Sequence, residues 1–141
     1  MRFWDSSAIV PLLVAERHSN EIVRYAQEEL VTFVWWGARV ELTSAIARRE
    51  REGELSIDEA GRLTVRADAL LDAWRDVRPS NELRGLAQRF VRVHPLSASD
   101  AFQLAAAWTA CEARPANMDF VCLDDRLRRV AAMEGFQLLP T

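Results

Sequence analysis

The sequence contains no lysine, and all 18 of its basic residues are arginines. This absence excludes several common enzyme classes. A P-loop that cradles phosphates needs a lysine before its Ser or Thr, and Schiff-base chemistry needs an amine. Phosphoaspartate domains of the receiver or haloacid-dehalogenase type normally place a lysine beside the reactive aspartate. The chain therefore belongs to none of these classes in their standard form.

Cysteine, glycine and proline are also scarce. The two cysteines, Cys111 and Cys122, are too few for a disulfide framework or a thiolate zinc site. We expect both to be buried, reduced thiols in a cytoplasmic protein. Five glycines and five prolines argue against low complexity and disorder. No apolar run reaches the ~18 residues of a membrane span, so we expect no membrane association.

What the sequence does contain indicates an α/β protein. Half of the 141 residues are hydrophobic, which suffices for one domain, residues 1–141, with a substantial core. Short apolar or β-branched runs predict strands at approximately 2–4, 31–34, 77–79, 120–123 and 136–139. Capping residues and helical patterns predict helices at approximately 6–15, 18–30, 36–51, 56–74, 80–90, 97–113 and 124–135. This alternation is typical of a parallel sheet with helices on both faces.

Four acidic residues differ from the others in their surroundings. Asp5 and Asp124 each follow a predicted strand, at the sheet edge where ligands bind in parallel α/β folds. Glu41 lies between Val40 and Leu42, and Asp100 precedes a nearly apolar helix. The three aspartates are also suitable as helix caps, worth ~1 kcal/mol each. Glu41 needs a partner or a shifted pKa, and one of the many arginines is an alternative partner for it.

Taken together, the four acids indicate a metal site. Carboxylates that gather at one place repel each other unless a hard divalent cation such as Mg²⁺ or Mn²⁺ joins them. Such an ion lowers the pKa of bound water and neutralises charge on a phosphate. The chemistry that this predicts is metal-assisted hydrolysis of a phosphodiester.

The order and spacing of four segments resemble those of a known family. The segments are Asp5-Ser6-Ser7-Ala8-Ile9-Val10, Glu41-Leu42-Thr43-Ser44-Ala45, His94-Pro95-Leu96 followed by Ser99-Asp100-Ala101-Phe102-Gln103-Leu104-Ala105-Ala106-Ala107, and Phe120-Val121-Cys122-Leu123-Asp124-Asp125-Arg126-Leu127. Over essentially its whole length the chain resembles the PIN-domain family, and specifically the VapC toxins of toxin–antitoxin pairs. The resemblance implies a three-layer α/β/α sandwich with a mainly parallel central sheet and a Mg²⁺-dependent ribonuclease activity, with Mn²⁺ as a substitute ion.

The resemblance also assigns the site residues. Asp5, Glu41 and Asp100 match the family's core acidic triad, and Asp124 matches its more variable fourth acid. All four are expected to hold the metal and to act in catalysis.

One position departs from the family pattern. The family commonly has Thr or Ser two residues before the fourth acid, where this chain has Cys122. Asp125 and Asp119 are therefore alternative fourth acids. Ser6 or Ser7 is a candidate for orienting Asp5 or a metal-bound water, with helix capping as the alternative role for both.

The arginines form two clusters. For Arg48, Arg49 and Arg51 we favour a solvated helix face paired with nearby glutamates. The second cluster lies beside Asp124 and is the better candidate for RNA contact, through Arg126, Arg128 and Arg129.

The resemblance further implies a homodimer and a VapB-like antitoxin whose tail covers the active site. Leu12-Leu13, Ile22 and the helix from Ser56 are candidate interface elements. Most of the five tryptophans are expected in the core, and any exposed one would suit a partner surface. Two other functions stay open: a catalytically inactive PIN-fold protein that binds RNA or a partner, and a metal-dependent DNA nuclease.

Overall fold

The computed structural model describes residues 1–28 and 30–141. Its strands are β1 (Arg2–Trp4), β2 (Thr32–Trp35), β3 (Arg75–Val77), β4 (Asp119–Val121) and β5 (Gln137–Leu139). Its helices are α1 (Ser6–Leu13), α2 (Ser19–Ala26), α3 (Ala38–Arg51), α4 (Ile57–Asp72), α5 (Asn81–Val93), α6 (Ala98–Ala110) and α7 (Asp125–Met133), with a short 3-10 turn at Pro115–Asn117. Every predicted strand and helix is present, with shifted ends.

The strands form one parallel sheet in the order β3-β2-β1-β4-β5. β1 lies at the centre, where Phe3 is in register with Phe33 of β2 and Phe120 of β4. Because all of the strands run in one direction, their carboxyl ends meet at one edge of the sheet. The predicted parallel sheet is confirmed.

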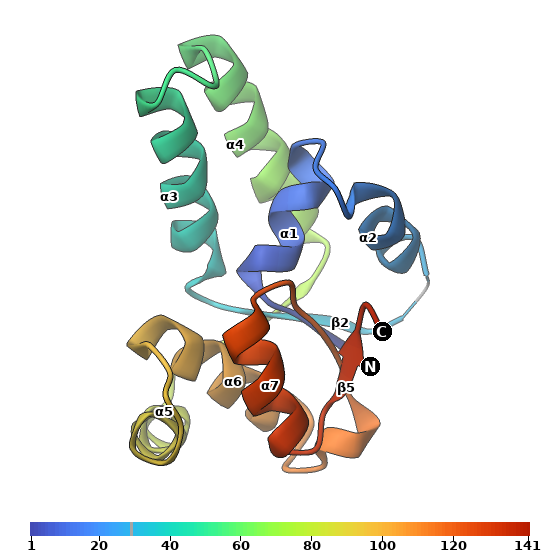
Figure 1. Cartoon of the computed structure of the whole chain (residues 1–141), viewed down its shortest axis with the longest axis vertical. Coiled ribbons are helices and arrows are strands. Elements are labelled where there is room, and N and C mark those ends of the chain that lie inside the picture. The colour runs from blue at the N-terminus through green and yellow to red at the C-terminus, as the bar shows by residue number, and fades with distance from the viewer. Residues whose placement is uncertain (29) are drawn as a thin grey trace.

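Helices cover both faces of the sheet (Figure 1). The core on one face joins Trp4 and Val34 to α1–α4. The core on the other face joins Phe3 and Phe120 to α5, α6 and α7. Neighbouring strand residues such as Phe3 and Trp4 point to opposite faces, which is why both can be fully buried. The fold is thus the predicted α/β/α sandwich, and α3 and α4 form a hairpin that extends away from its sheet (Figure 1).

Serine caps start three of the helices where the sequence predicts them. Ser56 and Glu59 form a capping box at α4. Ser80 caps α5 and Ser97 caps α6 through their side-chain oxygens. Each cap accepts a hydrogen bond from a backbone N–H that has no partner within the helix, and so fixes the first turn.

Each predicted helix has at least one shifted end, and α1, α2 and α3 are examples. α1 ends at Leu13, not near residue 15, with Pro11 inside its last turn. α2 ends at Ala26, not near residue 30, and residue 29 of that predicted helix lies outside the described residues. α3 begins at Ala38, not at residue 36, because Trp35 completes β2.

His94, which precedes a proline and looks like a loop residue in the sequence, is buried. It is the C-cap of α5, and its Nε2 lies 2.6 Å from the Oε1 atom of Glu134 beyond α7. The pair therefore ties α5 to the end of α7. Both cysteines are buried and free, as predicted. No helix within the described residues has both the length and the apolar composition needed to cross a membrane.

Candidate active site

The four predicted acids converge on the carboxyl edge of the sheet from different layers. Asp5 directly follows β1, and Asp124 follows the neighbouring strand β4. Glu41 lies on α3, which covers one face of the sheet, and Asp100 lies in the first turn of α6, which covers the other. Asp5 and Asp124 also cap α1 and α7, so the capping role that the sequence left open for them is present.

Asp5 is the most enclosed of the four and is only 5% exposed. Its Oδ2 accepts hydrogen bonds from the backbone N–H of Ser7 at 3.0 Å and from the Ser7 hydroxyl. The Cys122 thiol donates to the same oxygen at 3.6 Å. Ser7 in turn accepts a hydrogen bond from Leu123 N at 2.9 Å, which links the start of α1 to the loop after β4. Asp5 is therefore held in place by both strand ends.

Cys122 thus occupies the place of the family's Ser or Thr and still contacts Asp5. Burial raises the pKa of its thiol, and the charge of Asp5 raises that pKa further. The thiol therefore keeps its proton at neutral pH and acts as a weak donor.

Glu41 is oriented by two residues of α6. Gln103 donates from Nε2 to Glu41 Oε1 at 3.0 Å and to Ser6 Oγ at 2.9 Å. Ser99 donates from its hydroxyl to Glu41 Oε2 at 3.2 Å. Ser6 accordingly supports Glu41 through Gln103, whereas Ser7 supports Asp5.

Gln103 is the functional residue that the sequence interpretation missed. It is 0% exposed, and its two hydrogen bonds connect α1 to α3. A signal was present, because Gln103 is the one polar side chain in the run Ala101–Ala107 and lies three positions after Asp100, on the same helix face. A lone amide in a buried face needs a specific partner, but the partner could not be identified from spacing.

Negative charge dominates the site. Burial raises the pKa of Asp5 above its usual range, and the hydrogen bonds from Ser7 and Cys122 offset this only in part. Burial also raises the pKa of Glu41, and the charge of Asp5 adds to that rise. Within the described part of the chain, no ion pair includes Asp5, Glu41, Asp100 or Asp124.

Asp100 connects this cluster to α7. Burial raises the pKa of its carboxyl, and the charge of Asp124 raises it further. The positive charge of Arg126 acts in the opposite direction. Arg126 therefore lies close enough to Asp100 to interact with it, although the two form no ion pair.

The donor set fits a hydrated divalent cation. Among residues 1–28 and 30–141, no three His, Cys, Asp or Glu side chains lie close enough together to surround an ion directly. Mg²⁺ commonly keeps several of its waters and binds through only one or two carboxylates. Oxygen donors with excess negative charge are the ligands that it prefers, so Asp5 and Asp100, with Glu41 and Asp124 beside them, are suited to hold it.

The two alternative fourth acids lie in different places. Asp119 begins β4, at the opposite edge of the sheet from Asp124, and its Oδ2 pairs with Arg2 at 3.2 Å. It is therefore excluded as a site residue. Asp125 is exposed in the first turn of α7, next to Asp124.

The three arginines after Asp124 have different environments. Arg126 and Arg129 are exposed. Arg128 donates to the carbonyl oxygens of Cys122, Leu139 and Pro140 at 2.7, 3.1 and 2.6 Å. Its guanidinium is therefore engaged with the loop after β4 and the end of β5, which leaves Arg126 and Arg129 as the residues of this cluster free to meet a phosphate. In the first arginine cluster, Arg49 pairs with Glu16 and Glu54.

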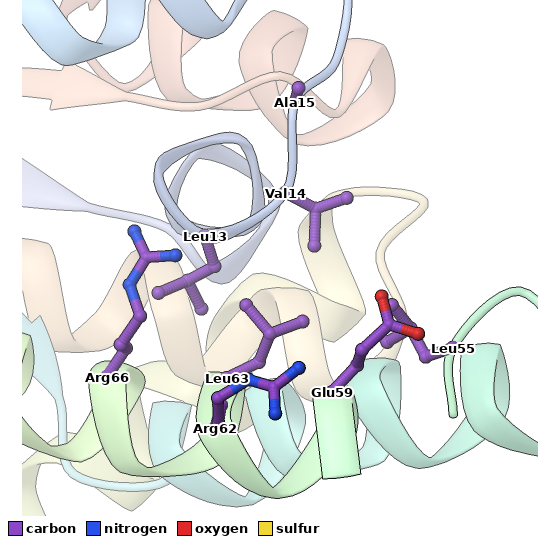
Figure 2. Close-up of a pocket in the computed structure, with 8 residues that line it drawn as sticks. All are labelled: Leu13, Val14, Ala15, Leu55, Glu59, Arg62, Leu63 and Arg66. Atoms are coloured by element: carbon purple, nitrogen blue, oxygen red, sulfur yellow. The ribbon is translucent and has the colours of Figure 1, made fainter. Parts of the chain in front are cut away.

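A separate groove of about 480 Å³ lies between the end of α1 and α4, at the far end of α1 from Asp5. Leu13 and Leu63 line it, and Glu59, Arg62 and Arg66 surround them (Figure 2). Two of the candidate interface elements, Leu13 and the helix after Ser56, therefore border one groove. Ile22 was a wrong candidate, because it is 0% exposed within the core under α2.

Comparison with solved structures finds the fold of this chain in three proteins, and it agrees with the fold that the sequence resemblance predicted. FitAcB from Neisseria gonorrhoeae matches with a TM-score of 0.70 at 12% identity, over 98% of this chain and 96% of that one. VapC20 from Mycobacterium tuberculosis, described as a sarcin–ricin loop cleaving toxin, matches with a TM-score of 0.70 at 17% identity, over 96% of each chain. VapBC-1 from nontypeable Haemophilus influenzae matches with a TM-score of 0.62 at 12% identity, over 97% and 95%. No family model and no curated protein matches the sequence.

Because burial raises the pKa of Asp5, we expect its charge to destabilise the fold when no cation is bound. An acid whose folded pKa is raised contributes stability below its unfolded pKa and loses it as the pH rises through the folded pKa. Asp5→Asn removes that charge and keeps an oxygen to accept from Ser7. We expect this variant to melt a few degrees above wild type at neutral pH in EDTA, since 1 kcal/mol corresponds to roughly 2–4 °C in a chain of about this size.

The difference in melting temperature between Asp5→Asn and wild type should become smaller as the pH falls and Asp5 becomes protonated. Thermal denaturation followed by circular dichroism measures both effects. A lower melting temperature for Asp5→Asn at neutral pH would show that Asp5 is stabilising as an ionised cap.

Proposed function

We propose that this chain is a Mg²⁺-dependent endoribonuclease that acts in the cytoplasm as the toxin of a VapBC-type pair. One observation carries the proposal. Four carboxylates lie at the carboxyl edge of the sheet, and none forms an ion pair with a described arginine. They belong to Asp5, Glu41, Asp100 and Asp124. A cation is the simplest means of balancing such a site.

In this role each side chain has a specific task. Asp5 and Asp100 bind Mg²⁺ directly, and Glu41 and Asp124 complete the site. Bound Mg²⁺ supplies positive charge against the phosphodiester and makes water a better nucleophile. Mn²⁺ is expected to substitute for it. Ser7, Ser99 and Gln103 fix the orientation of the acids, which are then preorganised for the reaction.

The shared fold supports the proposed toxin role. VapC20, with the same fold, is described as a sarcin–ricin loop cleaving toxin, and FitAcB and VapBC-1 share the fold as well. By the same reasoning, the protein is proposed to pair with a VapB-like antitoxin and to form a homodimer.

Purified protein tests the activity. We expect it to cut RNA in Mg²⁺, to leave single-stranded DNA of the same sequence intact, and to lose all cleavage in EDTA. Cleavage of DNA alone would favour the DNA nuclease. RNA binding without cleavage under any metal condition would favour the inactive PIN-fold protein.

Induced expression tests the toxin role. Wild type should arrest growth, Asp100→Asn should not, and coexpression of an adjacent antitoxin-like gene should restore growth. Arrest by both variants alike would count against nuclease toxicity.

A further inference from the structure

An aromatic hollow lies at the same sheet edge as the carboxylates. Its volume is about 390 Å³, and its lining includes Trp35, Trp36, Phe102 and Arg84. Trp35 ends β2 and Trp36 follows it, Phe102 lies on α6, and the rest of the lining comes from the segment after β3 and the first residues of α5 (Asn81–Val93). β1, which leads to Asp5, is the next strand of the sheet after β2. The hollow is therefore adjacent to the acidic site along one edge.

Helix α6 contributes residues to both the hollow and the carboxylate site. Phe102 lines the hollow, Asp100 lies two residues before it, and Gln103, the next residue, donates to Glu41 at 3.0 Å. Asp100 and Phe102 are two residues apart on α6, so their side chains point to different sides of the helix.

The closer link runs along the sheet edge: Trp4 is in register with Val34, so Trp35, which lines the hollow, lies beside Asp5. A ligand that fills the hollow is thus a neighbour, along this edge, of a group bound at the acids.

The rings of the hollow are ordered and partly open. Trp35 and Phe102 are stacked, with centroids 5.4 Å apart and an interplanar angle of 3°. Trp36 meets Trp35 edge-on, at 6.5 Å and 70°, and is 55% exposed. Trp36 N donates to Val77 O at 3.1 Å, which fixes its backbone at the sheet edge.

Gly37 makes this arrangement sterically possible. A Cβ atom at this position would lie 2.5 Å from Trp35 Nε1, so any side chain here would displace the indole. The backbone at Gly37 therefore packs directly against the Trp35 indole, and Trp36 lies beside that indole.

The chemistry of the lining points to a nucleic-acid ligand. Aromatic faces stack on bases regardless of sequence, and a guanidinium adds positive charge against a phosphate. Arg84 supplies that charge, and one of its donors is shared with Asn81 Oδ1 at 3.0 Å. None of the described lining residues is acidic, in contrast to the neighbouring site.

We propose that the hollow binds an unpaired RNA base next to the cleaved phosphodiester, with Trp36 as its stacking residue. The proposal rests on the proposed ribonuclease function and deepens it, because it gives Trp36 a base-stacking role beside the cleaved bond. A duplex keeps its bases stacked inside the helix and cannot offer one to Trp36 without being opened.

The test is a binding measurement in an Asp100→Asn background with Mg²⁺ present. The probe is a fluorescein-labelled single-stranded RNA of about a dozen nucleotides, within the range of lengths that single-strand binders contact. We expect Trp36→Ala to weaken binding about 10-fold or more, because stacking contributes ~1–3 kcal/mol per base. Trp36→Phe should stay within about 3-fold of the parent, since it keeps a π face.

Val65→Ala is the matched surface control. Val65 is 69% exposed on α4, away from the hollow, so its truncation should leave RNA affinity unchanged. Thermal denaturation of each variant checks that the fold is intact, as expected for a half-exposed indole. A duplex of the same sequence should bind the parent more weakly than the single strand does.

Unchanged affinity in Trp36→Ala, equal weakening in Trp36→Phe, or a preference for duplex would each overturn the inference. The measurement is of binding and not of cleavage. Wild type that fails to cut RNA would therefore contradict the proposed function, while a loss of affinity in Trp36→Ala would still support the stacking site.

Discussion

Asp100→Asn is expected to lower the rate of Mg²⁺-dependent RNA cleavage at least about 100-fold. Asp100 is proposed to bind the ion directly, and the loss of partners that merely orient metal ligands already costs about 10- to 100-fold. The side chain keeps its size, so the melting temperature should not fall. Single-turnover cleavage of an end-labelled RNA, with enzyme in excess, measures the rate without product release.

Asp125→Asn is the matched control, because it makes the same change one residue beyond Asp124. Asp125 is exposed in the first turn of α7, and we expect its variant to cleave within about 3-fold of wild type. Asp124→Asn should be impaired, because the charge of Asp124 acts on Asp100. If Asp125→Asn cleaved RNA more slowly than Asp124→Asn, Asp125 would be the fourth acid. Full cleavage activity in Asp100→Asn would contradict the metal site.

Arg128→Ala is expected to lower the free energy of unfolding by about 3 kcal/mol. Its guanidinium donates to three carbonyl oxygens at 2.7, 3.1 and 2.6 Å. Each hydrogen bond from a charged donor contributes ~1.5–3 kcal/mol, and Leu139 O keeps a second donor in Cys122 N. Urea denaturation followed by circular dichroism gives the change in unfolding free energy.

Arg126→Ala and Arg129→Ala separate this structural role from contact with RNA. Both side chains are exposed, so each variant should stay within about 0.5 kcal/mol of wild type in stability. Each should bind RNA more weakly, with a smaller dependence of affinity on salt. If Arg128→Ala were as stable as wild type and bound RNA more weakly, Arg128 would be a phosphate contact.

Much of the fold could be predicted from local signals in the sequence. Continuously apolar strands such as Phe120–Leu123 indicate burial on both faces, and caps such as Ser56 and Ser97 mark the helix starts. Because strands and helices alternate along the chain, the sequence favours a parallel sheet. Helix ends were less predictable, because the end of α1 after Pro11 depends on packing as well as on propensity.

The site could be predicted only where a residue's place follows from strand direction. Asp5 and Asp124 follow strands, so their shared edge was predictable. Asp119 is only five residues before Asp124. However, Asp119 begins β4 and Asp124 follows it, so the two residues lie at opposite edges of the sheet. Sequence spacing alone does not show which of the two aspartates lies at the carboxyl edge, because that depends on where the strand begins and ends.

Contacts between layers lay outside what the sequence could predict. The hydrogen bonds from Gln103 to Ser6 and Glu41 join residues 97 and 62 positions apart. Arg128 resembles Arg126 and Arg129 in the sequence, and only the packing of β5 makes it different. Trp35 is buried as the last residue of β2, whereas Trp36 is exposed in the turn before α3.

The chemical nature of the new RNA ends distinguishes metal-assisted hydrolysis from attack by the RNA itself. Cleavage of RNA by wild type with Mg²⁺ in ¹⁸O-labelled water, followed by mass spectrometry of the fragments, shows which oxygen attacked the phosphorus. Hydrolysis at a carboxylate–metal site predicts one ¹⁸O in the phosphate at the new end and no 2′,3′-cyclic phosphate. A cyclic phosphate without ¹⁸O would show attack by the RNA's own 2′-hydroxyl and would contradict the proposed role of the four carboxylates.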